Sequence, residues 1–123
     1  MKPHAWIAVG ALWGAITVGL GAFGAHALEQ AVPPEDLALW ETAVHYQGLH
    51  ALALVLFGVS QQLRPRPCLG GWAFLLGSAI FSGTLYAMVL GGPRWLGAIT
   101  PIGGSAFLIG WAALAWHARR NLT

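Results

Sequence analysis

Long uncharged apolar runs alternate along the chain with short segments that hold its charged residues and most of its prolines. There are four such runs, at approximately residues 5–25, 43–63, 69–90 and 96–116. A helix of about 20 apolar residues crosses a hydrocarbon core of about 30 Å. The pattern therefore predicts a single all-α domain over residues 1–123, an integral membrane four-helix bundle.

Two of the runs admit another interpretation. The second carries His45, Gln47 and His50 in its first third, but its apolar residues surround the helix instead of forming the single stripe of a soluble amphipathic helix. The first resembles a signal peptide, with a small-x-small sequence from Ala25 to Ala27. Its uncharged stretch exceeds the typical signal core of about 7–15 residues, so we expect it to be retained as a span.

Composition supports a lipid environment. The chain is 57% hydrophobic and 8% charged, whereas soluble domains carry about 25% charged residues. Its six Lys and Arg residues are scattered, which does not fit a nucleic-acid-binding surface. The single cysteine, Cys68, excludes an intramolecular disulfide and a paired-cysteine metal site. We therefore expect the lipid bilayer, and no nucleic acid, as a partner.

The charges between the runs predict an orientation. Residues Lys2, Arg64, Arg66, Arg119 and Arg120 would lie on one side of the membrane. Residues Glu29, Glu35, Asp36 and Glu41 would lie on the other side, with Arg94 as its one basic residue. Lys and Arg are retained in cytoplasmic segments, so both termini are expected to be cytoplasmic.

Prolines indicate where two helices begin. Pro34 follows Pro33 and precedes two acids, the pattern of a helix start, so we predict a short interfacial helix between the first two spans. Thr100-Pro101 has two interpretations. It is either the N-cap and first residue of the fourth helix, or a proline kink inside a longer helix.

Small residues mark the expected packing faces. In lipid, helices associate through small residues that let their backbones approach. The first span repeats them at steps of three and four residues, and the fourth span has a similar face. The candidate packing positions are Gly10, Gly14, Gly21, Gly24, Gly103 and Gly110. Packing within the chain is the default expectation, although such a face could also meet a second copy or another membrane subunit.

Polar side chains at membrane depth are costly and suggest function. The predicted topology brings six of them toward the acidic side: His26, Tyr46, Gln47, His50, Tyr86 and Thr100. Tyr46 and Gln47 precede His50 by four and three residues and can face one direction. His45 and His50 differ by about 140° around a helix, which disfavours a two-histidine metal clip.

Three interpretations of this candidate polar cluster remain open. The favoured one is a cap in which the side chains hydrogen-bond one another. The second is a mouth or relay for protons or a small polar solute. The third is a metal or haem site using His26, His50 and a carboxylate such as Glu41. No catalytic or tight ligand motif occurs, so we expect no catalytic residue, metal ligand or cofactor.

Several segments together resemble a known family of small membrane proteins, domain of unknown function 423, which is related to transmembrane protein 256. They are Gly21-Ala22-Phe23-Gly24-Ala25-His26, Tyr46-Gln47, His50-Ala51-Leu52-Ala53, Phe81-Ser82-Gly83-Thr84-Leu85-Tyr86, Thr100-Pro101-Ile102-Gly103-Gly104 and Gly110-Trp111. The resemblance implies a compact multi-helix protein of the bacterial cytoplasmic (inner) membrane and brings no settled activity. Glu41 and His45 do not obviously match its motif, which weakens mechanisms that need them.

The sequence leaves two functional hypotheses. The first is a noncatalytic helix-packing protein that acts as a homo-oligomer or as an accessory subunit of a larger membrane complex. The alternative is a conduit for a small solute, protons or a metal, with the polar cluster at its outer mouth.

Overall fold

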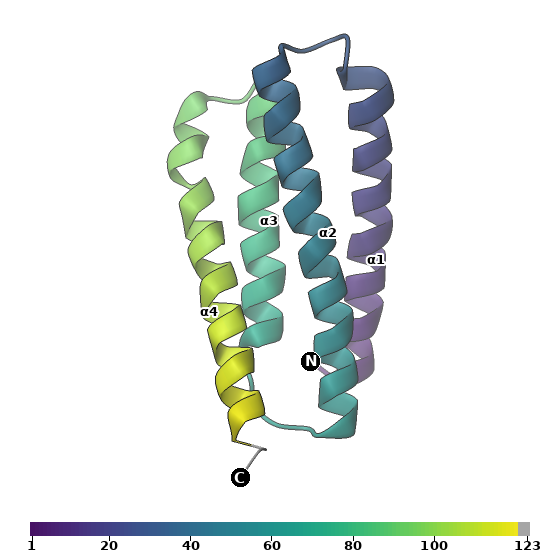
Figure 1. Cartoon of the computed structure of the whole chain (residues 1–123), viewed down its shortest axis with the longest axis vertical. Coiled ribbons are helices and arrows are strands. Elements are labelled where there is room, and N and C mark those ends of the chain that lie inside the picture. The colour runs from purple at the N-terminus through teal and green to yellow at the C-terminus, as the bar shows by residue number, and fades with distance from the viewer. Residues whose placement is uncertain (121–123) are drawn as a thin grey trace.

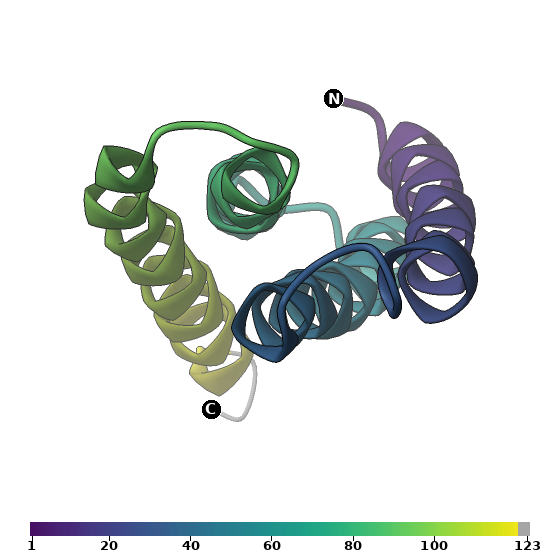
Figure 2. The same cartoon turned by 90° about the horizontal axis from the view of Figure 1, so that it is seen from above.

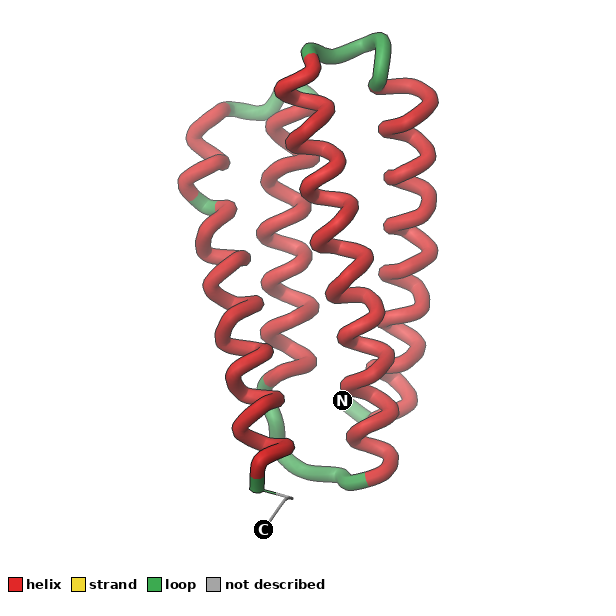
Figure 3. Tube along the Cα trace, viewed as in Figure 1, coloured by secondary structure: helices red, strands yellow, loops and turns green. Residues whose placement is uncertain are grey.

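The computed structural model describes residues 1–120, and in this part of the chain every regular element is helical (Figures 1 and 3). The four α-helices are α1 (Pro3–Phe23), α2 (Pro34–Leu63), α3 (Gly70–Val89) and α4 (Thr100–Arg119). A π-helical turn, η1 (Gly24–Leu28), extends α1, and a 3-10 turn, η2 (Arg94–Ala98), precedes α4. The predicted all-α four-helix architecture is confirmed.

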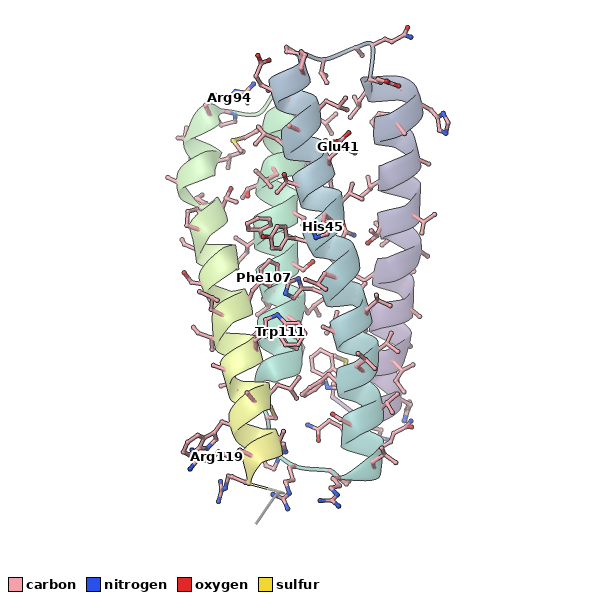
Figure 4. All side chains as sticks on the ribbon, viewed as in Figure 1. Glu41, His45, Arg94, Phe107, Trp111 and Arg119 are labelled. Atoms are coloured by element: carbon pink, nitrogen blue, oxygen red, sulfur yellow. The ribbon has the colours of Figure 1, made fainter. Side chains whose placement is uncertain are left out.

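Successive helices run antiparallel, so the start of α1 and the end of α4 lie at the same end of the bundle (Figure 1). Seen from above, α2 and α3 occupy the middle, with α1 beside α2 and α4 beside α3 (Figure 2). Arg119 lies at this end of the bundle, whereas Glu41 and Arg94 lie toward the other end (Figure 4). These two ends are called the basic end and the acidic end below.

All four helices are long and apolar enough to cross a membrane. Their outward faces carry large apolar side chains, including Leu12, Leu52, Leu76 and Leu108, each more than half exposed. Water would not solvate such a surface, whereas lipid chains match it. Length, composition and surface therefore agree on a membrane protein.

The predicted interfacial helix is wrong as a separate element. α2 does begin at Pro34, with Glu35 and Asp36 in its first turn, but it then continues without interruption to Leu63. No proline or glycine interrupts residues 35–47, and the Thr42 hydroxyl bonds to the carbonyl oxygen of Ala38 within the same helix. The predicted span 43–63 is thus the later part of one 30-residue helix.

The start of α4 settles the open question at Thr100-Pro101. α4 begins at Thr100, with Ile99 as its N-cap and Pro101 in its first turn, where no helical hydrogen bond is lost. The helix-start interpretation is close to the structure, with the cap one residue earlier than expected. Residues 94–98 form η2 instead of continuing α4.

Aromatic side chains fill the core. Near the basic end, Trp6, Leu54, Phe57 and Phe74 form one buried cluster, in which Trp6 and Phe57 meet edge to face at 5.5 Å. Toward the acidic end, the buried Trp40 packs against Tyr86 at a ring distance of 4.5 Å. These clusters fix the helices that position the polar residues.

Candidate functional site

His50 is the most enclosed member of the candidate polar cluster. Its side chain is 1% exposed between α2, α3 and α4. The imidazole lies parallel to the Phe107 ring at 3.6 Å between centroids and contacts the Phe74 ring at 5.6 Å. Figure 4 shows Phe107 and Trp111 directed from α4 toward this region. The ring thus packs as an aromatic side chain in the core.

Both nitrogens of His50 have partners. Nδ1 lies 2.7 Å from the carbonyl oxygen of Tyr46, and Trp111 Nε1 donates to Nε2 at 3.1 Å. A carbonyl can only accept and an indole can only donate, so these contacts place the imidazole hydrogen on Nδ1. The lone pair that would bind a metal is on Nε2, and Trp111 occupies it.

Gln47 and Tyr86 form a second, separate pair. Gln47 is 2% exposed, and the Tyr86 hydroxyl donates to its Oε1 at 2.6 Å. This bond joins α2 to α3. His50 is only three residues from Gln47 but bonds to α4 instead. The two side chains were expected to face one direction, and in the structure they bond to different neighbouring helices.

Thr100 belongs to a third pair. Its hydroxyl lies 2.7 Å from that of Thr84 and 3.2 Å from the carbonyl oxygen of Leu96. Thr84 also bonds back to Ile80 and Phe81 within α3. This pair links the start of α4 to α3.

The remaining two candidates are exposed. His26 lies exposed in η1. The Tyr46 side chain is 39% exposed, with its ring against Phe81 and parallel to Phe107. The structure therefore does not gather the six candidates into one cluster. Four of them belong to three separate hydrogen-bonded pairs, two of which include a residue outside the candidate set, and the other two have exposed side chains.

No metal centre is formed by the described residues. Within residues 1–120, no group of three or more His, Cys, Asp or Glu side chains is placed to hold an ion. His45 and Glu41 are exposed on α2, whereas His50 is buried. The residues considered for a metal or haem site do not converge.

The candidate packing glycines lie at helix crossings. A Cβ on Gly10 would lie 2.8 Å from Val55 N, and one on Gly103 would lie 2.5 Å from Phe81 N, so both positions bring backbones close. Gly24 and Gly110 face the rings of Trp40 and Phe74. The two others are less crowded: a Cβ on Gly21 would lie 3.3 Å from Val44, and one on Gly14 3.9 Å from Ala51.

The buried Ser82 on α3 donates to the carbonyl oxygen of Ala43 on α2 at 2.7 Å. Tryptophan contacts that also organise the bundle were not predicted, among them the bond from Trp111 to His50. Trp40 donates to the carbonyl oxygen of Leu20 at 2.8 Å, at the point where α1 changes into the π-turn. A tryptophan that faces a neighbouring helix usually has a hydrogen-bond partner for its indole N–H, so polar groups on the adjacent helices could have indicated these contacts.

Comparisons with known proteins agree with this architecture. Residues 20–104 match the family model described as protein of unknown function (DUF423). UPF0382 membrane protein SH2409 of Staphylococcus haemolyticus is 46% identical over 110 residues, covering 89% of this chain and 90% of the relative. UPF0382 membrane protein YwdK of Bacillus subtilis is 42% identical over 120 residues, covering 95% and 98%.

No solved structure matches the chain. The family match includes His26, Gln47, His50 and Tyr86, whereas Trp111 lies beyond the matched residues. The resemblance noted from the sequence is confirmed, and this chain belongs to the DUF423 family of membrane proteins.

Proposed function

We propose that the chain is a noncatalytic membrane protein that acts by helix packing, as a homodimer formed along the outward side of α1 and α2. The observation that carries this proposal is a lipid-facing groove of small residues bordered by two exposed polar side chains, Glu41 and His45. This groove is called the outer seam. An accessory role in a larger complex is the other outcome that the experiments below distinguish.

The outer seam consists of two hollows along the α1–α2 contact. One of about 350 Å³ lies toward the basic end and includes Gly14, Gly48 and Leu52. The other, of about 330 Å³, includes Gly21, Glu41 and His45. Small residues at such a surface let a second helix approach closely, which is the main source of helix association in lipid. The seam thus has the shape of a helix-packing surface.

Glu41 and His45 make the seam poorly suited to lipid alone. They lie one helical turn apart on the same side of α2, and both are exposed (Figure 4). Within residues 1–120, neither side chain forms a hydrogen bond or an ion pair. Titratable groups at membrane depth generally face a protein partner or a water-filled cavity. A partner at the seam would satisfy both.

A second copy of the chain supplies the required chemistry. In a two-fold dimer with its axis along the membrane normal, every contact between two different residues occurs twice. If Glu41 of one copy meets His45 of the other, His45 of the first copy therefore also meets Glu41 of the second. Glu41 and His45 are separated by about 6 Å along the axis of α2, a distance that the two side chains together can span. The carboxylate of each copy would accept from the imidazole N–H of the other, giving two equal contacts.

The polar interior supports a noncatalytic role. His50 has both ring nitrogens bonded inside the bundle, and Gln47, Tyr86 and Thr100 bond to neighbouring helices. A conduit that uses His50 as a relay would have to break the contact with Trp111 in each cycle. We therefore expect proton flux through liposomes to be the same for the natural chain and for His50→Ala; flux that depends on His50 would favour the conduit.

The orientation that we propose places the basic end, with both termini, in the cytoplasm and the acidic end outside, across the bacterial inner membrane. The five basic residues at one end and the four acidic residues at the other support this orientation. A reporter that is active only in the cytoplasm should function at the C-terminus. A reporter that is active only outside should function when inserted after Ala31, and the opposite result would reverse the orientation.

Exchanging the two seam residues tests the dimer. In Glu41→His, both carboxylate acceptors are lost and four imidazoles meet, and in His45→Glu, four carboxylates repel, so both single variants should be monomers. The double exchange restores two complementary contacts and should restore the dimer. Glu29→Arg alters an exposed acid outside the seam and serves as the control.

The measurement is subunit counting by single-molecule photobleaching in liposomes at low protein-to-lipid ratio. The proposal expects two copies for the natural chain, the control and the double exchange. Monomers in all variants, including the natural chain, would refute the homodimer. A different membrane protein retained with the natural chain and lost in both single variants would assign the seam to an accessory role.

A further inference from the structure

A second groove lies between α1 and α3, on a different side of α1 from the outer seam. Its volume is about 180 Å³. The side chains that line it come from three helices and include Trp13, Leu20, Gln47, Gly83 and Tyr86. Trp13 Nε1 donates to Ser78 Oγ at 2.7 Å and thereby connects α1 to α3 directly. The groove is therefore bounded by a specific contact between two helices.

Gln47 brings unused hydrogen-bond donors to this groove. Its side chain is almost fully buried, and Oε1 accepts from Tyr86. The amide has two further hydrogens on Nε2, and no residue in the described part of the chain accepts from them. Exchanging the amide oxygen and nitrogen would leave the same surplus, because Gln47 and Tyr86 together hold three donor hydrogens and share one bond.

The position of Gln47 along α2 limits what can accept from it. It lies 13 residues after Pro34 and 16 residues before Leu63. At 1.5 Å per residue these separations are about 20 and 24 Å, which places Gln47 near the middle of the hydrocarbon core. Ester carbonyls of phospholipids lie at the interface and would not reach this depth. A partner helix is about 10 Å across with its side chains and is too wide to bring a backbone carbonyl into a groove of about 180 Å³.

We propose that this groove binds a lipid-soluble quinone, with a ring carbonyl accepting from Gln47 Nε2. Such a molecule carries an acceptor into the middle of the bilayer, and its flat ring suits a small groove bordered by Trp13 and Tyr86. The position of Gly83 leaves room for the ring, since a Cβ there would meet nothing within 4 Å. The hydrocarbon tail would extend through the open side into lipid.

The test is a titration of the natural chain in lipid nanodiscs with a short-chain benzoquinone and a short-chain naphthoquinone, followed by calorimetry. At least one quinone should bind saturably, with one molecule per chain. A naphthalene with the same alkyl chain but no carbonyls should only partition into the lipid. The proposal would be overturned if the carbonyl-free compound bound saturably, or if neither quinone did.

Three variants locate the binding site. Gln47→Leu removes the donor and should raise Kd at least tenfold. Gly83→Leu fills the groove from a position with free space, so it should fold normally and also weaken binding at least tenfold. Gln62→Leu changes an exposed glutamine on the same helix, outside the groove, and should bind like the natural chain. Unchanged quinone affinity in Gly83→Leu would overturn the site.

Native mass spectrometry of the same samples tests the identity of the acceptor. The expected result is a quinone adduct that is absent from Gln47→Leu and Gly83→Leu. A phospholipid retained by the natural chain and lost in both variants would assign the acceptor to a lipid ester and contradict the quinone proposal. The outcome is independent of the dimer, because no residue of the outer seam lines this groove.

Discussion

The two sides of α2 are held by different interactions. Toward α3 and α4, aromatic rings and buried polar contacts dominate, with His50 between Phe107 and Trp111. Toward α1, close backbone approach dominates: a Cβ on Gly10 or Gly58 would come within 2.9 Å of backbone atoms of the opposite helix. Burial of apolar surface does not drive helices together in lipid, so each side depends on its own packing and polar contacts.

This difference indicates where the molecule can meet a partner. On the α3–α4 side, His50 and Thr100 have their polar groups engaged inside the bundle. On the α1 side, Glu41 and His45 face outward, and Gln47 has donors left over. Both of our proposals concern the α1 side for this reason.

The largest expected effect is on the aromatic side. His50→Ala removes a stacked ring and leaves the Trp111 N–H without its acceptor, so the free energy of unfolding should fall by about 3 kcal/mol. His4→Ala alters an exposed histidine on α1, outside both proposed surfaces, and should stay within about 0.5 kcal/mol. Equilibrium unfolding in mixed micelles, followed by circular dichroism, compares them. Equal losses would show that His50 is not a core residue.

The next effect concerns the α1 side. Gly10→Leu forces α1 away from α2, because the added side chain meets backbone atoms that cannot move aside, and should cost about 2 kcal/mol. Gly19→Leu is the matched control on the same helix, since a Cβ there would have nothing within 4 Å. The same unfolding experiment applies. A loss as small as that of the control would contradict the close approach of these helices.

A smaller effect isolates one hydrogen bond. Trp111→Phe keeps a ring against Phe74 but leaves His50 Nε2 unpaired, which should cost about 1 kcal/mol. Trp95→Phe changes an exposed tryptophan in η2 and should have no measurable effect. A double-mutant cycle of Trp111→Phe with His50→Phe should give a coupling energy close to the loss of stability in Trp111→Phe alone. Strict additivity would mean that this bond does not contribute.

The smallest effect is at the acidic end. Arg94 makes two contacts with Asp36, at 3.0 and 3.1 Å, but its side chain is 62% exposed. Such a pair contributes about 0.5 kcal/mol and weakens with salt. Unfolding of Arg94→Ala and Asp36→Asn at low and high salt should show a small coupling that disappears at high salt. A coupling above about 2 kcal/mol would indicate that this ion pair is important for holding η2 against α2.

Some features could be predicted because they depend on the order of residues alone. Run lengths indicated the four helices, and Pro34 with its two acids indicated where α2 begins. The extent of that helix was not predicted. The absence of proline and glycine from residues 35–47 permits one continuous helix, but it does not require the residues after Pro34 and the second span to share one axis.

The candidate site could be predicted only as a set of residues. Gln47 and His50 are on one side of α2, but their partners depend on the rotation of α3 and α4, which the sequence pattern leaves undetermined. Trp111 was missed for the same reason. The division into pairs is a tertiary property.

Cross-linking from the outer seam tests the central claim most directly. In a Cys68→Ser background, Leu52→Cys places a thiol in the seam, and Leu76→Cys places one on the exposed side of α3. A short bifunctional maleimide added to intact membranes should give a covalent dimer from the Leu52→Cys chain and leave the Leu76→Cys chain monomeric. No dimer from Leu52→Cys, or equal amounts from both positions, would contradict the proposed homodimer.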